Sequence, residues 1–292
     1  MLRRIVLATL LAGLLVGIGT PLAQAQQPTG MGQPATTSSG WSFDITPYVW
    51  FATINAGLKL NLPPAIGGTV STDTSIGFGE LLSRINFGAM VAADARYDRF
   101  VILTDFLYLN VGDVASQINS VNVPNRPNIP ISTTVQTGVS LRLSVPIWTL
   151  AGGYTVAQGN WGNFDAIVGF RYLSLNARVN HSLALTLAGP RGNSATFETV
   201  GGVTGSTDIW NGIAGFRGRI RISDSALFVP YYFDIGAGGS NLTWQIASGL
   251  GYQFGWGDVS LIYRYLSFDQ GSDSVLQSLK VRGPMIALNI SF

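Results

Sequence analysis

The stretch Arg84-Ile-Asn-Phe-Gly-Ala-Met-Val-Ala-Ala-Asp-Ala-Arg-Tyr97 alternates between two kinds of side chain. Its odd-numbered positions, from Ile85 to Tyr97, are apolar or aromatic, whereas Arg84, Asp94 and Arg96 lie at even-numbered positions. A period of two is typical of a β-strand with one apolar face. The stretch is somewhat longer than the roughly ten residues that a tilted strand needs to cross a bilayer, which favours a strand of a transmembrane β-barrel.

The same alternation recurs along the chain. In residues 133–147, Leu141 and Leu143 share a face that we expect to contact lipid, and Arg142 lies on the opposite face. In residues 242–254, Trp244 and Ile246 alternate with Thr243 and Gln245 in the same way. Repeated strands with one apolar face predict an antiparallel sheet that closes on itself, since only a closed sheet satisfies every backbone group in lipid.

The predicted fold class is all-β, a single closed antiparallel transmembrane β-barrel of ten strands, with eight or twelve as the alternatives. Tight polar turns near 98, 160, 224 and 256 alternate with mostly longer connections, as in barrels with short periplasmic turns and long outer loops. Tyr and Trp residues near the strand ends, such as Tyr97 and Trp256, predict aromatic girdles. The ten predicted strands span residues 41–60, 84–97, 99–113, 131–156, 163–187, 206–223, 226–238, 241–254, 257–269 and 278–292.

The N-terminus has the parts of a secretory signal peptide. Arg3 and Arg4 precede an uncharged apolar segment, and Ala23-Gln24-Ala25 is a small-x-small cleavage site, so residues 1–25 are predicted to be removed; an uncleaved anchor helix is the alternative. Residues 26–40 are predicted to form a disordered periplasmic linker, and residues 41–292 the barrel.

Composition agrees with a membrane barrel. Of 292 residues, 47% are hydrophobic and 11% are charged, against about a quarter charged in a typical soluble domain. Without the two arginines of the signal peptide, 15 basic residues balance 15 acidic ones, so no nucleic-acid partner is expected. There is no cysteine, which excludes disulfides and a lipoprotein anchor.

The C-terminal residues form a final amphipathic strand. Ile286, Leu288, Ile290 and Phe292 alternate with smaller or polar residues. An alternating last strand that ends in Phe resembles the assembly signal that outer-membrane barrels present to their insertion machinery. We therefore expect Phe292 to serve as an assembly signal. The expected partners are this machinery and outer-membrane lipid, and the expected location is the outer membrane of a Gram-negative bacterium.

Several short motifs carry a second resemblance. The segment Trp41-Ser-Phe-Asp-Ile-Thr-Pro-Tyr-Val-Trp50, together with Asp105-Phe-Leu-Tyr108, Arg171-Tyr-Leu and Pro230-Tyr-Tyr-Phe-Asp234, resembles a group of uncharacterised proteobacterial outer-membrane barrels with an opening TPYxW strand. The resemblance covers most of residues 41–292. It implies a barrel and assigns no activity, so no functional residue is carried over.

Charged residues on barrel strands are expected to face the lumen, since an arginine facing lipid at mid-depth costs about 2–4 kcal/mol. Arg217, Arg219 and Arg221 recur at a spacing of two and predict a basic ladder, with Asp234 as its nearest acidic partner. In one interpretation these charges line an anion-attracting passage; in the other they pair and plug a narrow lumen. The predicted lumen-lining residues are Arg84, Arg96, Arg142, Arg171, Arg217, Arg219, Arg221, Arg264, Asp44, Asp94, Asp105, Asp165 and Asp234.

Enzymatic chemistry has little support in the sequence. The one histidine, His181, is followed by Ser182, and this pair alone does not specify a catalytic triad. There is no metal-binding spacing and no phosphate-binding loop, so no catalytic residue, metal or cofactor is predicted. The leading hypothesis is a structural barrel or a narrow passive channel for small solutes. A rim enzyme acting on lipid or peptide and a surface adhesion module are the alternatives.

Overall fold

The computed structural model describes residues 40–61, 69–115, 117–122, 136–188, 194–239, 241–271, 274 and 276–292, and it is nearly all β. The predicted signal peptide, its cleavage site and nearly all of the predicted linker lie outside these residues. The elements are β1 (Trp41–Trp50), β2 (Thr53–Asn61), β3 (Thr69–Ile76), α2 (Phe78–Arg84), β4 (Ile85–Tyr97), β5 (Phe100–Ala115), β6 (Gln117–Asn122), β7 (Gln136–Gly159), β8 (Gly162–Ala188), β9 (Ser194–Arg221), β10 (Leu227–Gly238), β11 (Leu242–Gln253), β12 (Gly257–Asp269) and β13 (Leu276–Ser291).

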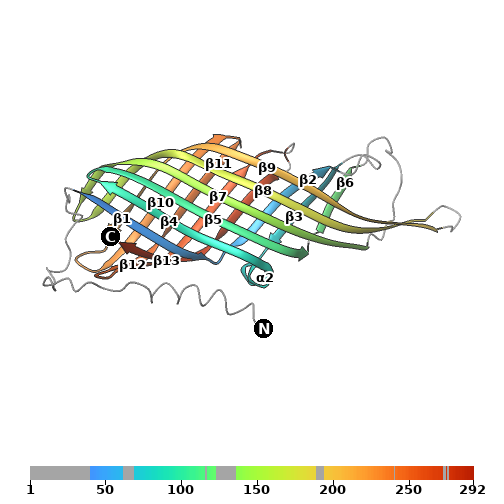
Figure 1. Ribbon diagram of the computed structural model, residues 1–292, viewed down its shortest axis with the longest axis horizontal. Coiled ribbons are helices and arrows are strands. Elements are labelled where there is room, and N and C mark those ends of the chain that lie inside the picture. The colour runs from blue at the N-terminus through green and yellow to red at the C-terminus, as the bar shows by residue number, and fades with distance from the viewer. Residues whose placement is uncertain are drawn as a thin grey trace. The chain divides into compact units, whose positions relative to one another are not determined.

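Ten of the strands close into an antiparallel barrel, as the sequence predicts (Figure 1). Their order around the wall is β1, β4, β5, β7, β8, β9, β10, β11, β12 and β13, and β13 pairs with β1 to complete the circle. In the closing pair Asp44 lies opposite Ser291 and Trp50 lies opposite Met285. The closed fold therefore has no free edge within the barrel wall, which is the requirement for a sheet in lipid.

The region before β4 differs from the prediction. The sequence predicts one strand over residues 41–60. The chain instead bends at Phe51 and Ala52, with β1 before the bend and β2 after it, and both strands pair with β13. At the bend the Trp50 indole donates a hydrogen bond to the Gly283 carbonyl (3.1 Å). A Cβ at position 283 would overlap the Phe51 carbonyl, so the two segments approach this closely because residue 283 is glycine.

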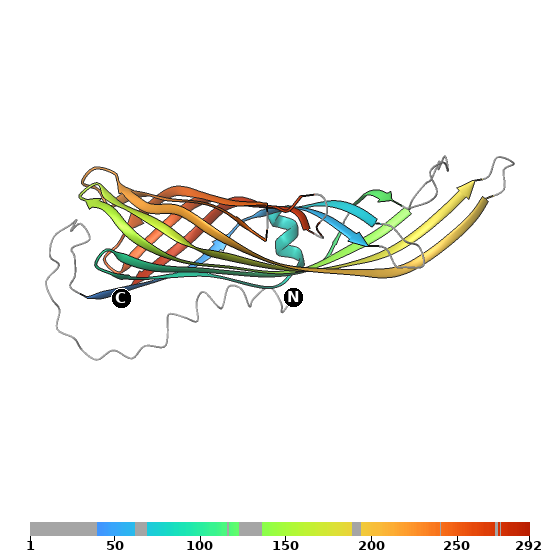
Figure 2. The ribbon, with the colours of Figure 1, turned by 90° about the horizontal axis from the view of Figure 1, so that it is seen from above.

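Two predicted loops contain regular structure. The connection at 61–83 holds β3 and α2, and the connection at 114–130 holds β6. Strands β2, β3 and β6 form a small antiparallel extension beyond β13. Strand β9 also begins at Ser194, well before the predicted residue 206, so β8 and β9 form a hairpin of 27 and 28 residues that extends beyond the barrel (Figure 2). These segments lack a strong period of two, which is why the sequence pattern assigned them to loops.

The two ends of the barrel are different. Tight turns between β4 and β5, β7 and β8, β9 and β10, and β11 and β12 lie at one end, here called the turn end, and the opposite end is called the loop end. Asp98 (φ 51°) and Ser223 (φ 54°) adopt the left-handed conformation that such turns require. Trp41 and Phe292 are also at the turn end, where their strands pair. By the general rule for bacterial barrels, the turn end corresponds to the periplasmic side.

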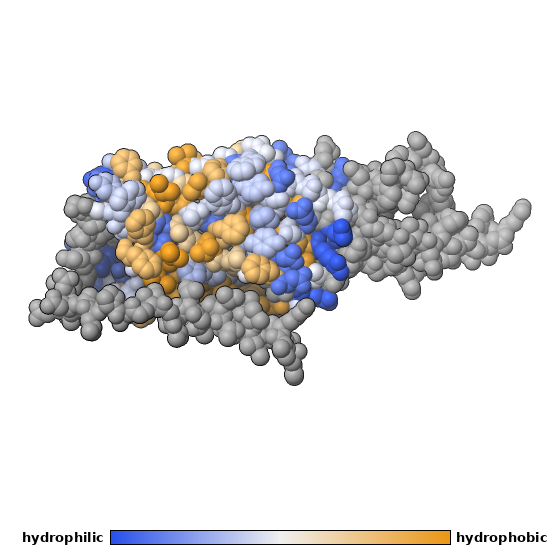
Figure 3. Space-filling view, viewed as in Figure 1, coloured by the Kyte–Doolittle hydropathy of each residue, from blue (hydrophilic) through white to orange (hydrophobic). Residues whose placement is uncertain are grey.

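The outer surface of the wall carries an apolar belt (Figure 3). Exposed side chains such as Ile102, Val168 and Leu261 point away from the barrel. Near the turn end, aromatic rings contact one another in groups such as Trp41 with Tyr97 and Phe254 with Trp256. A second aromatic layer toward the loop end contains Trp148, Phe170, Tyr172 and Trp210. A belt bounded by two aromatic layers is the surface expected of a transmembrane barrel.

Candidate functional site

The centre of the barrel interior contains a fully buried ion pair. The Arg171 guanidinium on β8 binds the Asp234 carboxylate on β10 through both of its terminal nitrogens, with Nη1 2.9 Å from Oδ1, and both side chains are 0% exposed. Thr149, Thr243 and Gln245 accept further hydrogen bonds from Arg171. A buried charge is tolerated only when it is paired and hydrogen-bonded in this way.

A second ion pair lies beside the first and is joined to it. Arg264 on β12 donates to the Asp105 carboxylate (2.6 Å) and to Gln245 (2.8 Å), the residue that also contacts Arg171. The Tyr48 hydroxyl donates to the other oxygen of Asp105 (2.6 Å). One connected network therefore links β1, β5, β7, β8, β10, β11 and β12 across the interior. Such a network holds its side chains in fixed positions.

A third group of charges lies closer to the turn end. Asp165 on β8 accepts hydrogen bonds from Arg96 (2.6 Å) and from the Thr155 hydroxyl (2.7 Å). Arg217 on β9 binds Asp94 on β4 (3.0 Å) and lies 3.7 Å from Asp165. The Asp165 side chain is buried, whereas Arg96, Arg217 and Asp94 are partly exposed. Solvent therefore reaches this level of the interior in part.

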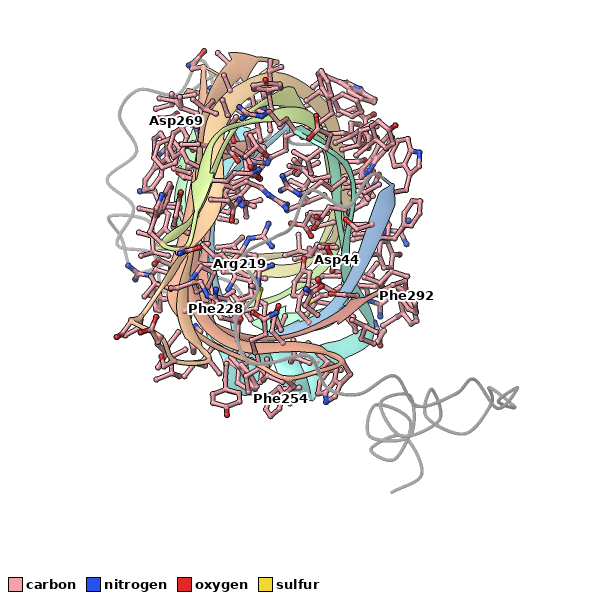
Figure 4. All side chains as sticks on the ribbon, turned by 90° about the vertical axis from the view of Figure 1, so that its left-hand side faces the viewer. Asp44, Arg219, Phe228, Phe254, Asp269 and Phe292 are labelled. Atoms are coloured by element: carbon pink, nitrogen blue, oxygen red, sulfur yellow. The ribbon has the colours of Figure 1, made fainter. Side chains whose placement is uncertain are left out.

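The last group lies at the turn end itself. Arg219 is 3.7 Å from Asp258, and its guanidinium stacks over the Phe228 ring. Asn289 on β13 donates to Asp258 (3.1 Å). The side chain of Arg219 is 39% exposed, so this level is open to water. Figure 4 looks into the barrel from this end and shows Arg219 and Asp44 pointing into the interior, with Phe254 and Phe292 outside the wall.

The interior near the loop end is apolar. Inward side chains such as Trp50, Leu173 and Phe268 form one buried cluster there. The short helix α2 lies at this end (Figure 2) and adds Leu81 to the cluster. The Arg264 guanidinium stacks on the Trp50 ring (4.7 Å to its centre) at the boundary between the charged and apolar levels. The interior thus has three levels: a partly hydrated vestibule, a buried ionic network and an apolar plug.

The structure brings most of the predicted lumen-lining residues onto the inward face. Arg221 shares the face of Arg217 and Arg219 at the turn end of β9. The sequence predicts Asp234 as the acidic partner of this ladder, and this is wrong, because Asp234 is bound by Arg171 instead. The ladder binds Asp94, Asp165 and Asp258. The inward residues are Arg96, Arg171, Arg217, Arg219, Arg221, Arg264, Asp44, Asp94, Asp105, Asp165 and Asp234.

Two predicted lumen residues lie elsewhere. Arg84 is the last residue of α2, where it is exposed and does not belong to a strand. Arg142 is exposed on the outer face of β7, whereas its neighbour Leu143 is buried in the interior cluster. The predicted facing is therefore wrong for residues 142–147, and the side chains of residues 133–141 lie outside the described part of the structure. The reason is that this part of β7 lies near the loop end, where the interior is apolar and the surroundings are polar.

Sequence reasoning missed several members of the network. Asp258, Tyr48, Thr149, Thr155 and Asn289 were not predicted as site residues, although each binds one of the interior charges. Asp258 shares its face with Arg264, because the two are six positions apart on β12. Counting every second residue of β12 back from Arg264 as inward-facing would have identified Asp258. Gln245 was on the predicted polar face of β11, but its bridging role depends on a register that the sequence does not specify.

Neither His181 nor a metal-binding cluster adds a second site among the described residues. The backbone of His181 lies in β8, opposite Val139 and Gly201, and its side chain is outside the described part of the structure. Among the described residues, no group of three or more His, Cys, Asp or Glu side chains is arranged to hold a metal ion. No helix in the described ranges is long and apolar enough to cross a membrane. The prediction that the chain is not an enzyme stays a prediction.

Comparison with known proteins supports the fold. No known family and no curated protein matches the sequence. Among solved structures, the outer membrane protease OmpT from Escherichia coli has a TM-score of 0.53 at 9% identity, over 87% of this chain and 97% of that one. The attachment invasion locus protein Ail of Yersinia pestis has a TM-score of 0.30 at 10% identity, over 87% of this chain and 99% of that one. The chain has the fold of Gram-negative outer-membrane β-barrels, in agreement with the predicted outer-membrane location.

Proposed function

We propose that this protein is a closed outer-membrane barrel with a structural role, and that it is not an open porin. The observation that carries the proposal is the buried pairing of Arg171 with Asp234 and of Arg264 with Asp105, joined through Gln245. Of the two interpretations of the lumen charges, this geometry supports the one in which the charges pair with one another and fill a narrow lumen. A narrow passage for small solutes would have to run between these side chains.

The apolar level strengthens the proposal. An ion that passed the paired charges would next meet Trp50, Leu173 and Phe268, with Leu81 of α2 beside them. An apolar constriction opposes the passage of ions because it offers no replacement for their water shell. Two barriers of different chemistry thus lie in series between the hydrated vestibule and the loop end.

Single-channel recording of the refolded protein in planar bilayers tests the proposal. We expect no steady conductance from the wild-type barrel. A small, stable conductance would instead establish a narrow channel. In that case Arg219→Glu, which reverses a charge in the vestibule, would change its ion selectivity, and Arg178→Gln on the outward face of β8 would serve as the matched control. A steady wild-type conductance would overturn the closed-barrel proposal.

The long β8–β9 hairpin favours a second candidate, a surface adhesion module. With 27 residues, β8 is more than twice the length of roughly ten residues that a membrane-spanning strand needs, so the hairpin reaches well beyond the apolar belt. Attachment of expressing cells to a coated surface, compared with cells whose barrel lacks residues 181–201, would test this role. Equal attachment by both, at equal amounts of surface barrel, would exclude it for this hairpin.

A further inference from the structure

Two basic side chains point outward from β13. Lys280 and Arg282 are two positions apart on this strand and both are exposed, whereas the alternate residues Leu279 and Val281 are buried in the interior cluster. Within the described part of the structure, neither basic side chain makes a hydrogen bond, an ion pair or a ring contact. Lumen arginines such as Arg171, in contrast, bind a carboxylate. The two outward charges are therefore available to a ligand that lies against the wall.

The outward carboxylate of the neighbouring strand does not neutralise this pair. Asp269 on β12 lies opposite Ser278, and its carboxylate accepts a hydrogen bond from the Gly271 amide (3.1 Å) instead of binding a cation. The residues directly beside the pair are all uncharged. They are Ser267 and Tyr265 on β12, and Asn55 and Thr53 on β2, opposite Lys280 and Arg282 respectively.

The pair lies at the level of the aromatic layer toward the loop end. Tyr265, opposite Arg282, stacks on Trp244 of β11 with 4.7 Å between the ring centres. Tyr265 directly follows Arg264 of the central network, and Tyr172 of the aromatic layer likewise follows the network arginine of β8. Both strands run from the turn end to the loop end, so the two tyrosines lie at a similar depth. Such layers mark the boundary between acyl chains and head groups, which is where the phosphates of lipids lie.

The spacing of the two charges suits a single phosphate group. Residues two positions apart on a strand are about 7 Å apart, so the long side chains of Lys280 and Arg282 can converge on one anion between them. Guanidinium and ammonium groups both form charge-assisted hydrogen bonds to phosphate. The Thr53 hydroxyl and the Asn55 amide, beside the pair on β2, are the kinds of group that bind sugar hydroxyls.

We propose that Lys280 and Arg282 bind a phosphate on the acylated sugar head group of an outer-leaflet glycolipid, lipid A. The loop end faces outward because the turn end is periplasmic, and the outer leaflet of a Gram-negative outer membrane carries its phosphate on such a sugar. Thr53 and Asn55 contact the sugar, and the acyl chains lie against Tyr265 and the apolar belt. The site is on the outer wall and does not depend on whether the lumen is closed.

Binding of diphosphoryl lipid A to the full refolded barrel in detergent, followed by native mass spectrometry, tests the site. We expect Lys280→Gln/Arg282→Gln to weaken binding by about tenfold or more, since the charge-assisted hydrogen bonds to phosphate are lost. The matched control is Arg84→Gln/Arg178→Gln, which removes two exposed charges at the same end of the barrel but on α2 and β8. All four side chains are exposed, so urea unfolding is expected to give the same stability for both variants. Arg282→Gln alone is the second variant, with an expected loss of about threefold or more.

Comparison ligands separate the possible sources of phosphate. Dephosphorylated lipid A, phosphatidylglycerol and inorganic phosphate are each expected to bind the wild-type barrel about tenfold or more weakly than diphosphoryl lipid A. Equal losses in the β13 and control variants would show general charge attraction and overturn the site. Equally tight binding of phosphatidylglycerol or of inorganic phosphate would overturn the choice of ligand. Unchanged binding of diphosphoryl lipid A by the two β13 variants would overturn the proposal as a whole.

Discussion

Replacing Asp234 with Asn tests the buried ion pair at the centre of the network. The substitution keeps the shape of the side chain but removes its charge, so the fully buried Arg171 loses its counter-ion and keeps only neutral partners, such as Thr149, Thr243 and Gln245, among the described residues. Removing one member of a buried pair typically costs about 3–5 kcal/mol because the other charge stays buried without compensation. We therefore expect the free energy of unfolding of Asp234→Asn to fall by this amount, or about 10²- to 10⁴-fold in the folding equilibrium.

Urea unfolding of the barrel in lipid vesicles, followed by tryptophan fluorescence, measures this loss. Arg219→Gln is the control, since it breaks an ion pair of 3.7 Å at a side chain that is 39% exposed, where about 0.2–1 kcal/mol is expected. The double variant Arg171→Met/Asp234→Leu should recover most of the loss, because it leaves no unpaired charge in the interior. A loss below about 1 kcal/mol in Asp234→Asn, or an equal loss in Arg219→Gln, would refute the reasoning.

Three further predictions concern the plug, assembly and processing. Leu81→Ala in α2 should lower the free energy of unfolding by about 2–5 kcal/mol, because Leu81 is 3% exposed, whereas Leu82→Ala, at 47% exposure, should change it by less than about 0.5 kcal/mol in the same urea titration. Phe292→Ala should refold in vitro like the wild type, since this side chain is 70% exposed, but it should reduce the amount of barrel in the outer membrane of cells, as measured by quantitative immunoblotting; normal yield would argue against an assembly signal. N-terminal sequencing of the membrane-inserted protein should give Gln26 as the first residue, and material that begins at Met1 would contradict cleavage of a signal peptide.

The sequence predicts the barrel wall well where lipid lies outside and polar groups lie inside. Strand β4 follows this rule from Phe87 to Tyr97: Phe87, Val91 and Tyr97 are exposed, whereas Asp94 and Arg96 bind partners across the interior. The strand number and the tight turns follow from the same alternation, because each turn interrupts a period of two.

The rule fails for β7 beyond the membrane. There Leu143 packs inward and Arg142 faces outward, since the loop-end interior is filled by apolar residues and the exterior is polar. The aromatic residues Trp148 and Tyr154 on the same strand have the outward phase, and following it back to residue 142 would have corrected the assignment. Amphipathic alternation reports which residues share a face, but it does not report which face is inside.

The partners within the network were beyond prediction for a different reason. Arg171 and Asp234 lie on β8 and β10, with β9 between them, so their contact depends on two successive registers and on the curvature of the wall. The sequence identified both residues as inward charges but paired Asp234 with the neighbouring strand. Only the closed geometry shows that the arginine two strands away reaches it.

The closure between β1 and β13 has a consequence for how the chain folds. The hydrogen bond from Ser291 to Asp44 joins residues 247 positions apart, and Thr46 bonds Asn289 across 243 positions. Contacts between residues so far apart in the sequence form slowly, because the chain loses the entropy of closing a long loop before any favourable contact forms. The wall cannot close until β13 has been synthesised and exported, so the earlier strands have to wait in the periplasm with their apolar faces unprotected. Exposure of these apolar faces during that interval is expected to make the unclosed chain prone to aggregation.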